Sequence, residues 1–161
     1  MVKMITHFLF SFGVVAIALA PFLHSWWLIF PATIVALFTN LAIDLFGHEG
    51  GSRTPLTHSI VYAPVWGIGL GAVFGFIMYI QTRGQMPIAM FSAWILCGVI
   101  SSLCHLFSDS LTQGGIYVPT EHKKNARWRI ASYKYNNPML NLGLIALGLA
   151  LLYLANLIIG D

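Results

Sequence analysis

The chain has 161 residues, of which 58% are hydrophobic and only 8% are charged, with a formal net charge of +3. Its mean hydropathy is +0.79. A soluble domain carries about 25% charged residues, so the few charges here could not cover a water-exposed surface. These values exclude an ordinary soluble domain. They predict an all-α integral membrane protein, a polytopic helical bundle that forms one domain over residues 1–161.

Five apolar segments alternate with polar stretches along the chain, and each is long enough to cross a hydrocarbon core of about 30 Å. The first segment is interpreted as a retained span and not a cleaved signal peptide, because Pro21 directly follows the would-be cleavage sequence. The last segment begins at Pro138, a favourable first residue of a helix. The predicted spans are residues ~4–23, ~25–46, ~56–80, ~87–111 and ~138–159, and residues 113–137 form a long polar loop.

The basic residues predict how these spans are oriented. With the N-terminus inside, Arg83 is the one residue among the eight Lys and Arg that falls outside. Cytoplasmic loops are enriched in Lys and Arg, so we predict a cytoplasmic N-terminus and a cytoplasmic 113–137 loop in a plasma or inner membrane. The residues on the inner side are Lys3, Arg53, Lys123, Lys124, Arg127, Arg129 and Lys134.

This topology gathers ionisable side chains at the inner face. His105 and Asp109 are four residues apart in the fourth span, so they lie on one face of that helix. Asp44 lies at the end of the second span, His48 follows in the next loop, and His58 opens the third span. Ionisable groups are costly near hydrocarbon and usually have a partner, a metal or a function there.

Histidine nitrogens and carboxylate oxygens are ligands of zinc and of harder divalent ions. We therefore predict a divalent metal site of one or two ions, with zinc favoured and magnesium or manganese as alternatives. Asp109 could instead act as a general base, and both roles remain open. Arg53 is predicted to bind the anionic group of a substrate, because its planar fork matches phosphate oxygens. Thr57 and Ser59 are predicted to hydrogen-bond to ligands or substrate. The predicted metal ligands are Asp44, His48, His58, His105 and Asp109.

The 113–137 loop predicts a partner. Its basic residues are interleaved with Trp128, Tyr133 and Tyr135, which favours contact with anionic membrane lipids. This contact is either ordinary anchoring or the binding of head groups. Nucleic acid is not expected as a partner, because the basic patch is small and adjoins the membrane.

Two features of the spans concern packing. Gly67, Gly71 and Gly75 recur every four residues, a pattern typical of close helix contacts. The contact is either within the chain or between copies in a homo-oligomer. His7, near the start of the first span, is interpreted as an interfacial histidine.

Several of these residues form a pattern over roughly residues 40–119. Asp44 ends a span, Arg53 lies in the next loop, and Thr57-His58-Ser59 opens the next helix. Gly98 then precedes a segment that runs from His105-Leu-Phe-Ser-Asp109-Ser-Leu-Thr to Gly115. The pattern resembles the LexA-regulated, membrane-bound metal-dependent hydrolase family and its archaeal relatives of unknown function. The resemblance implies a metal site and a hydrolase.

Two classes of function follow from the sequence. The first is a membrane metal-dependent hydrolase with its site at the cytoplasmic face, acting on a phosphoester or a lipid head group. The alternative is a non-enzymatic membrane scaffold or oligomer in which the His/Asp cluster is structural. Transport of protons or metal ions is disfavoured, because no ionisable residue lies near the middle of a predicted span.

Overall fold

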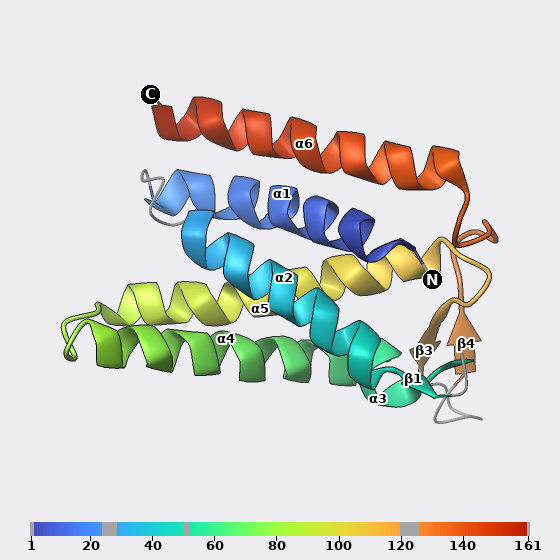
Figure 1. The fold of residues 1–161 in the computed structure, drawn as a ribbon, viewed down its shortest axis with the longest axis horizontal. Coiled ribbons are helices and arrows are strands. Elements are labelled where there is room, and N and C mark those ends of the chain that lie inside the picture. The colour runs from blue at the N-terminus through green and yellow to red at the C-terminus, as the bar shows by residue number, and fades with distance from the viewer. Residues whose placement is uncertain (1, 24–28, 50–51, 120–125, 161) are drawn as a thin grey trace.

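The computed structural model describes residues 2–23, 29–49, 52–119 and 126–160. Long helices form most of this part of the chain and make a bundle (Figure 1). The all-α helical bundle expected from the sequence is confirmed. The long helices are α1 (Met4–Leu23), α2 (Ile29–Phe46), α4 (Tyr62–Gln81), α5 (Ile88–Ser110) and α6 (Pro138–Gly160).

Four of the described helices are long and apolar enough to cross a membrane. They are Met4–Phe22, Tyr62–Gln81, Ile88–Ser110 and Pro138–Gly160. The remaining apolar helix, α2, is shorter over Pro31–Phe46 and runs obliquely against α1 and α5 (Figure 1). The chain is thus a membrane protein by helix length and composition, and α2 is the shortest of the five expected spans.

Small elements occupy the connections at one end of the bundle. The short helix α3 (Pro55–His58) and two antiparallel strand pairs lie together there (Figure 1). Strand β1 (His48–Glu49) pairs with β2 (Ser52–Arg53), and β3 (Ile116–Val118) pairs with β4 (Ala126–Trp128). The 113–137 loop therefore contains a β-ribbon that the sequence did not predict. Residues 120–125, which include Lys123 and Lys124, lie outside the described residues.

The start of the third predicted span differs from expectation. The sequence predicted one continuous helix from about residue 56, but α3 ends at His58 and Ser59 is extended (φ −102°, ψ 142°). The Ser59 backbone instead forms a bridge with Tyr117 of β3. This break lets His58 point into the end of the bundle while α4 continues along it.

The glycine face of α4 packs against α5 inside the chain. A Cβ at Gly67 would collide with the backbone of Gly98, and one at Gly71 would collide with the backbone of Trp94 and Ile95. The two helices therefore touch backbone to backbone, as small residues permit in membranes. Of the two uses expected for this face, packing within the chain is the one that the structure contains.

The two ends of the bundle differ in charge. The N-terminus, the strands and α3 share one end, and the α4–α5 connection that contains Arg83 lies at the other (Figure 1). Arg53 in β2 and Arg127 in β4 belong to the first end. This asymmetry agrees with the positive-inside rule. The assignment of this end to the cytoplasmic side stays a prediction.

We expect Gly67→Ala to destabilise the protein by roughly 1–3 kcal/mol, because the added methyl group meets backbone that cannot rotate away. Thermal unfolding of the purified protein in detergent measures the change. Gly69→Ala is the matched control, since nothing lies within 4 Å of a Cβ at Gly69 in the same helix. Equal unfolding temperatures for the two variants would contradict the close α4–α5 contact.

Candidate metal centre

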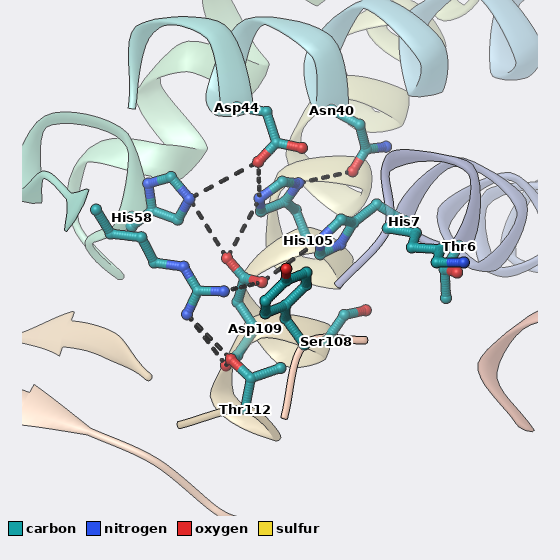
Figure 2. A network of polar contacts seen from close by, with 12 residues as sticks. Thr6, His7, Asn40, Asp44, His58, His105, Ser108, Asp109 and Thr112 are labelled. Carbon is teal, nitrogen blue, oxygen red and sulfur yellow. Dashed lines mark hydrogen bonds and ion pairs between the residues drawn. The ribbon is translucent and has the colours of Figure 1, made fainter. Parts of the chain in front are cut away.

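Asp109 is the most connected side chain at the polar end of the bundle. It lies in the last turn of α5 and is completely buried. Its Oδ1 is 2.6 Å from Arg53 Nη2 and 3.4 Å from His7 Nε2. Its Oδ2 is 3.3 Å from His58 Nε2 and 3.5 Å from His105 Nε2. One carboxylate therefore meets side chains from α1, β2, α3 and its own helix (Figure 2).

Asp44, in the last turn of α2, faces the same histidines from the other side. Its Oδ1 lies 3.5 Å from His105 Nε2 and 4.0 Å from His58 Nε2. Asp44 Oδ1, His58 Nε2, Asp109 Oδ2 and His105 Nε2 thus form a ring of four atoms (Figure 2). These four atoms are buried and have no hydrogen-bond partner in the described structure.

The dimensions of this four-atom ring suit the ligands of one metal ion. Neighbouring atoms in the ring are 3.3, 3.5, 3.5 and 4.0 Å apart. Two ligand atoms on a tetrahedral zinc ion, with bonds of about 2.0–2.1 Å, lie about 3.4 Å from each other. The sequence predicted that Asp44, His58, His105 and Asp109 would converge, and the structure brings all four together.

The protonation of His105 follows from Asn40, one turn before Asp44 in α2. The Asn40 amide donates to Ser11 Oγ (3.2 Å) and to the Ala36 carbonyl oxygen (2.7 Å). Its Oδ1 lies 2.9 Å from His105 Nδ1 and therefore accepts the Nδ1 proton. In the neutral ring the lone pair is then on Nε2, which faces the carboxylates of Asp44 and Asp109.

An arrangement of this kind needs a cation. A lone pair on His105 Nε2 and two carboxylate oxygens, each 3.5 Å away, repel one another when nothing lies between them. Burial strengthens that repulsion, because the local dielectric is low and water is excluded. The cation is either a metal ion or a proton on the imidazole. Buried His/Asp groups at this end could therefore hold a metal ion.

His58 is held by its sequence neighbour. Thr57 Oγ1 lies 2.9 Å from His58 Nδ1, which leaves Nε2 directed at Asp44 and Asp109. Burial lowers the pKa of His58 to about 4, against the opposing effect of its contact with Asp109. The ring is therefore neutral at neutral pH, which is the form that binds metals.

His48 lies at the edge of this cluster. Its Nδ1 donates to the Asp44 carbonyl oxygen at 2.8 Å, and its ring meets the His58 ring edge-on at 4.9 Å. One ligand atom each from Asp44, His48 and His58 lies within 4.8 Å of the others. His48, in β1, is thus close enough to the cluster to be a metal ligand, which is the role that the sequence predicted for it.

Arg53 contacts the ligands and the surrounding backbone. Besides Asp109, its guanidinium donates from Nη1 to Thr112 Oγ1 (3.2 Å) and to the Gly115 carbonyl oxygen (2.7 Å). The side chain is buried, and burial lowers the pKa of Arg53 while Asp109 raises it. Ser59, also a predicted site residue, accepts a hydrogen bond from the Val61 amide at the start of α4.

His7 and Asn40 belong to the site and were not among the residues predicted for it. The interpretation of His7 as interfacial is wrong, because the side chain is fully buried and stacks on His105 with ring centroids 3.9 Å apart. One ligand atom each from His7, His105 and Asp109 lies within 4.8 Å of the others. Asn40 precedes Asp44 by four residues, the same helical spacing as His105 and Asp109, and that spacing could have identified it.

The sequence was compared with known proteins. A family described as "Protein of unknown function (DUF1286)" matches residues 2–108, more than half of the 161 residues. The chain belongs to this family. No curated protein and no solved structure matches the chain. The matched range ends just before Asp109 and includes most of the polar residues described above, among them His7, Asp44, His58 and His105.

We expect Arg53→Met to destabilise the protein by about 3–5 kcal/mol, because it leaves the buried Asp109 carboxylate without its closest positive partner. Unfolding by heat or denaturant in detergent measures the loss, with Arg83→Met as the control that removes an exposed guanidinium at the other end. If both variants unfolded at the same temperature or denaturant concentration as the unmodified protein, the Arg53–Asp109 pair would not contribute to stability.

Proposed function

We propose that this protein is an integral membrane metal-dependent hydrolase. The observation that carries the proposal is the lone pair of His105 Nε2, which faces two buried carboxylate oxygens. None of these three atoms has a hydrogen bond to any described residue. A divalent cation between them would turn this repulsion into coordination. The residues that would hold it are Asp44, His58, His105 and Asp109, with His48 as an additional ligand.

Zinc is the metal that this donor set favours. Two imidazole nitrogens with two carboxylate oxygens suit a borderline ion better than magnesium, which prefers oxygen ligands and retains water. Manganese is the second choice, because it accepts mixed oxygen and nitrogen ligands. When bound, such an ion supplies Lewis acidity, which polarises a phosphoryl oxygen and makes a water molecule more acidic.

The chain's own residues have distinct tasks in this proposal. Asn40 and Thr57 orient the two imidazoles through their Nδ1 atoms, as partners of metal-binding histidines commonly do. Arg53 holds Asp109 Oδ1 and so directs Oδ2 toward the histidines. Because Arg53 binds Oδ1 and Oδ2 would bind the ion, Asp109 serves as a ligand and not as the general base.

His7 is the group best placed to move a proton. Its ring is buried against His105, and its Nδ1 has no hydrogen-bond partner in the described structure. An imidazole with a free nitrogen beside a reactive centre can accept a proton and later return it. His7 therefore takes the acid–base role that the sequence left open to a carboxylate.

The substrate that we propose is a phosphoester or a lipid head group. The centre lies at the end of the bundle that carries Arg53, Arg127 and Arg129, and cationic side chains favour an anionic substrate. The resemblance to the LexA-regulated metal-dependent hydrolases supports the same reaction class. With the positive-inside bias, the site would face the cytoplasm from a plasma or inner membrane.

The structural alternative also rests on a specific observation. The Arg53–Asp109 pair ties β2 to α5, so the cluster could serve to hold the polar end together, with a proton on the His105 imidazole in place of a metal. In that case removal of His105 would lower stability and leave metal content unchanged. Metal analysis therefore separates the two functions.

We expect the purified protein to bind one zinc ion per chain, and Asp44→Asn to lose most of it because a ligand oxygen becomes an amide. Elemental analysis after zinc loading and desalting gives the stoichiometry, and calorimetry gives the affinity. Glu49→Gln is the matched control, since Glu49 is an exposed acid in the neighbouring strand β1. Equally low zinc in all three proteins would exclude the metal centre.

We further expect hydrolysis of a chromogenic phosphomonoester that EDTA abolishes and that zinc or manganese restores. Asp109→Asn should be inactive under all these conditions, because it removes a ligand charge. Zinc should also raise the unfolding temperature of the unmodified protein. A free ligand at 100 times its dissociation constant stabilises the folded state by about 2.7 kcal/mol. A zinc-stabilised protein without activity toward phosphoesters or lipid phosphates would retain the metal site and reject the hydrolase.

A further inference from the structure

A cavity of about 300 Å³ lies next to the metal centre, on the other side of Arg53. It is formed by the segment that joins α5 to β3, by strand β4 and by the residue after β4. None of the described residues that line it is acidic. They are Gln113, Gly114, Gly115, Arg127, Trp128 and Arg129.

The two glycines separate the cavity from Arg53. A Cβ at Gly114 would lie 2.5 Å from Arg53 Nη1, so the guanidinium packs directly against the glycine backbone. Gly115 has a positive φ of 61°, a conformation that favours glycine, and its carbonyl oxygen accepts from Arg53. The guanidinium of Arg53 therefore lies directly behind the Gly114–Gly115 backbone that lines the cavity.

The two arginines that line the cavity are held in place, but not all of their N–H donors have a partner among the described residues. Arg127 Nε and Nη2 donate to the Tyr117 hydroxyl at 3.3 and 3.0 Å, and its guanidinium lies over the same ring. Arg129 Nη1 donates to the Gln113 carbonyl oxygen at 3.5 Å. A guanidinium has five N–H donors, so these contacts use only part of each group. The remaining donors can bind an anion.

We propose that this cavity is a binding site for a phosphate group. Two guanidinium groups among the described lining residues, with no carboxylate among them, favour an anion, and the arginine fork matches phosphate oxygens. Exposed apolar side chains in the same segment (Trp128, Ile130 and Tyr133) suit the interface of a membrane. The phosphate could belong to a lipid head group or to a soluble phosphoester.

This proposal goes beyond the proposed function and does not need the metal centre to be catalytic. Arg53 contacts Asp109 with Nη2 and the Gly115 carbonyl oxygen with Nη1. The cavity therefore lies next to the proposed metal ligands, and none of them lines it. A protein that binds phosphate but hydrolyses nothing would therefore still have this site. Tests of binding and of hydrolysis can give different answers.

The experiment measures phosphate binding to the full-length protein in EDTA, so that no metal ion can account for it. Calorimetry with inorganic phosphate is run on the unmodified protein and on the double variant Arg127→Gln, Arg129→Gln. We expect affinity to fall at least about tenfold, the effect of losing roughly 1.4 kcal/mol of charge-assisted hydrogen bonds. Lys134→Gln, an exposed cation in the same loop, is the control and should bind as the unmodified protein does.

A second arm distinguishes the two sources of phosphate. The same proteins are placed in nanodiscs of phosphatidylcholine with or without phosphatidic acid, and retained lipid is counted by mass spectrometry. Selective retention of phosphatidic acid that the double variant loses identifies a head-group site, whereas an effect confined to inorganic phosphate identifies a soluble ligand. Binding that is absent, or equal in the double variant and in Lys134→Gln, overturns the proposal. Unfolding temperatures confirm that the variants are folded.

Discussion

The contact between Arg53 and Asp109 is the constraint on which the polar end of this protein depends. An ionised carboxylate without exposure to water costs several kcal/mol unless a counter-charge and hydrogen bonds compensate. Arg53 supplies both at 2.6 Å, and to do so β2 must fold back over the last turn of α5. The same guanidinium bonds to the Gly115 carbonyl oxygen, which ties the chain after α5 to the chain before α3. Two loops distant in sequence are thus ordered by one ion pair.

The rest of the bundle places the ligands from rigid elements. Helix α5 packs against α1, α2 and α4, and the Gly67–Gly98 contact brings α4 against it at backbone distance. Asn40 joins α2 to α5 through His105 and to α1 through Ser11. Polar bonds of this kind inside a membrane protein fix the rotation of each helix about its axis, because a turned helix would leave them unpaired. The ligand positions are therefore set by the fold, which is what a preorganised site requires.

The sequence predicted the parts of this arrangement that depend on periodicity and charge. Apolar runs located the helices, and the four-residue spacing of His105 and Asp109 placed both on one face of α5. The convergence of Asp44 and His58 with that pair followed from topology alone. The burial of His7 in the cluster did not follow, because nothing in a single apolar helix shows which of its faces packs inward. The β3–β4 ribbon and the break at Ser59 were also missed, since both arise from tertiary pairing with Tyr117 and not from local preference.

The two oxygens of Asp109 also bear on how many metal ions the centre could hold. Two groups of potential ligands are present, one of His7, His105 and Asp109 and the other of Asp44, His48 and His58. A second cation beside His7 would have to use Asp109 Oδ1, and that atom is already 2.6 Å from the Arg53 guanidinium. Two positive charges on one oxygen repel each other strongly in a buried place. The asymmetry of Asp109 therefore favours a single ion on the Oδ2 side, and His7 would then remain beside the centre without being a ligand.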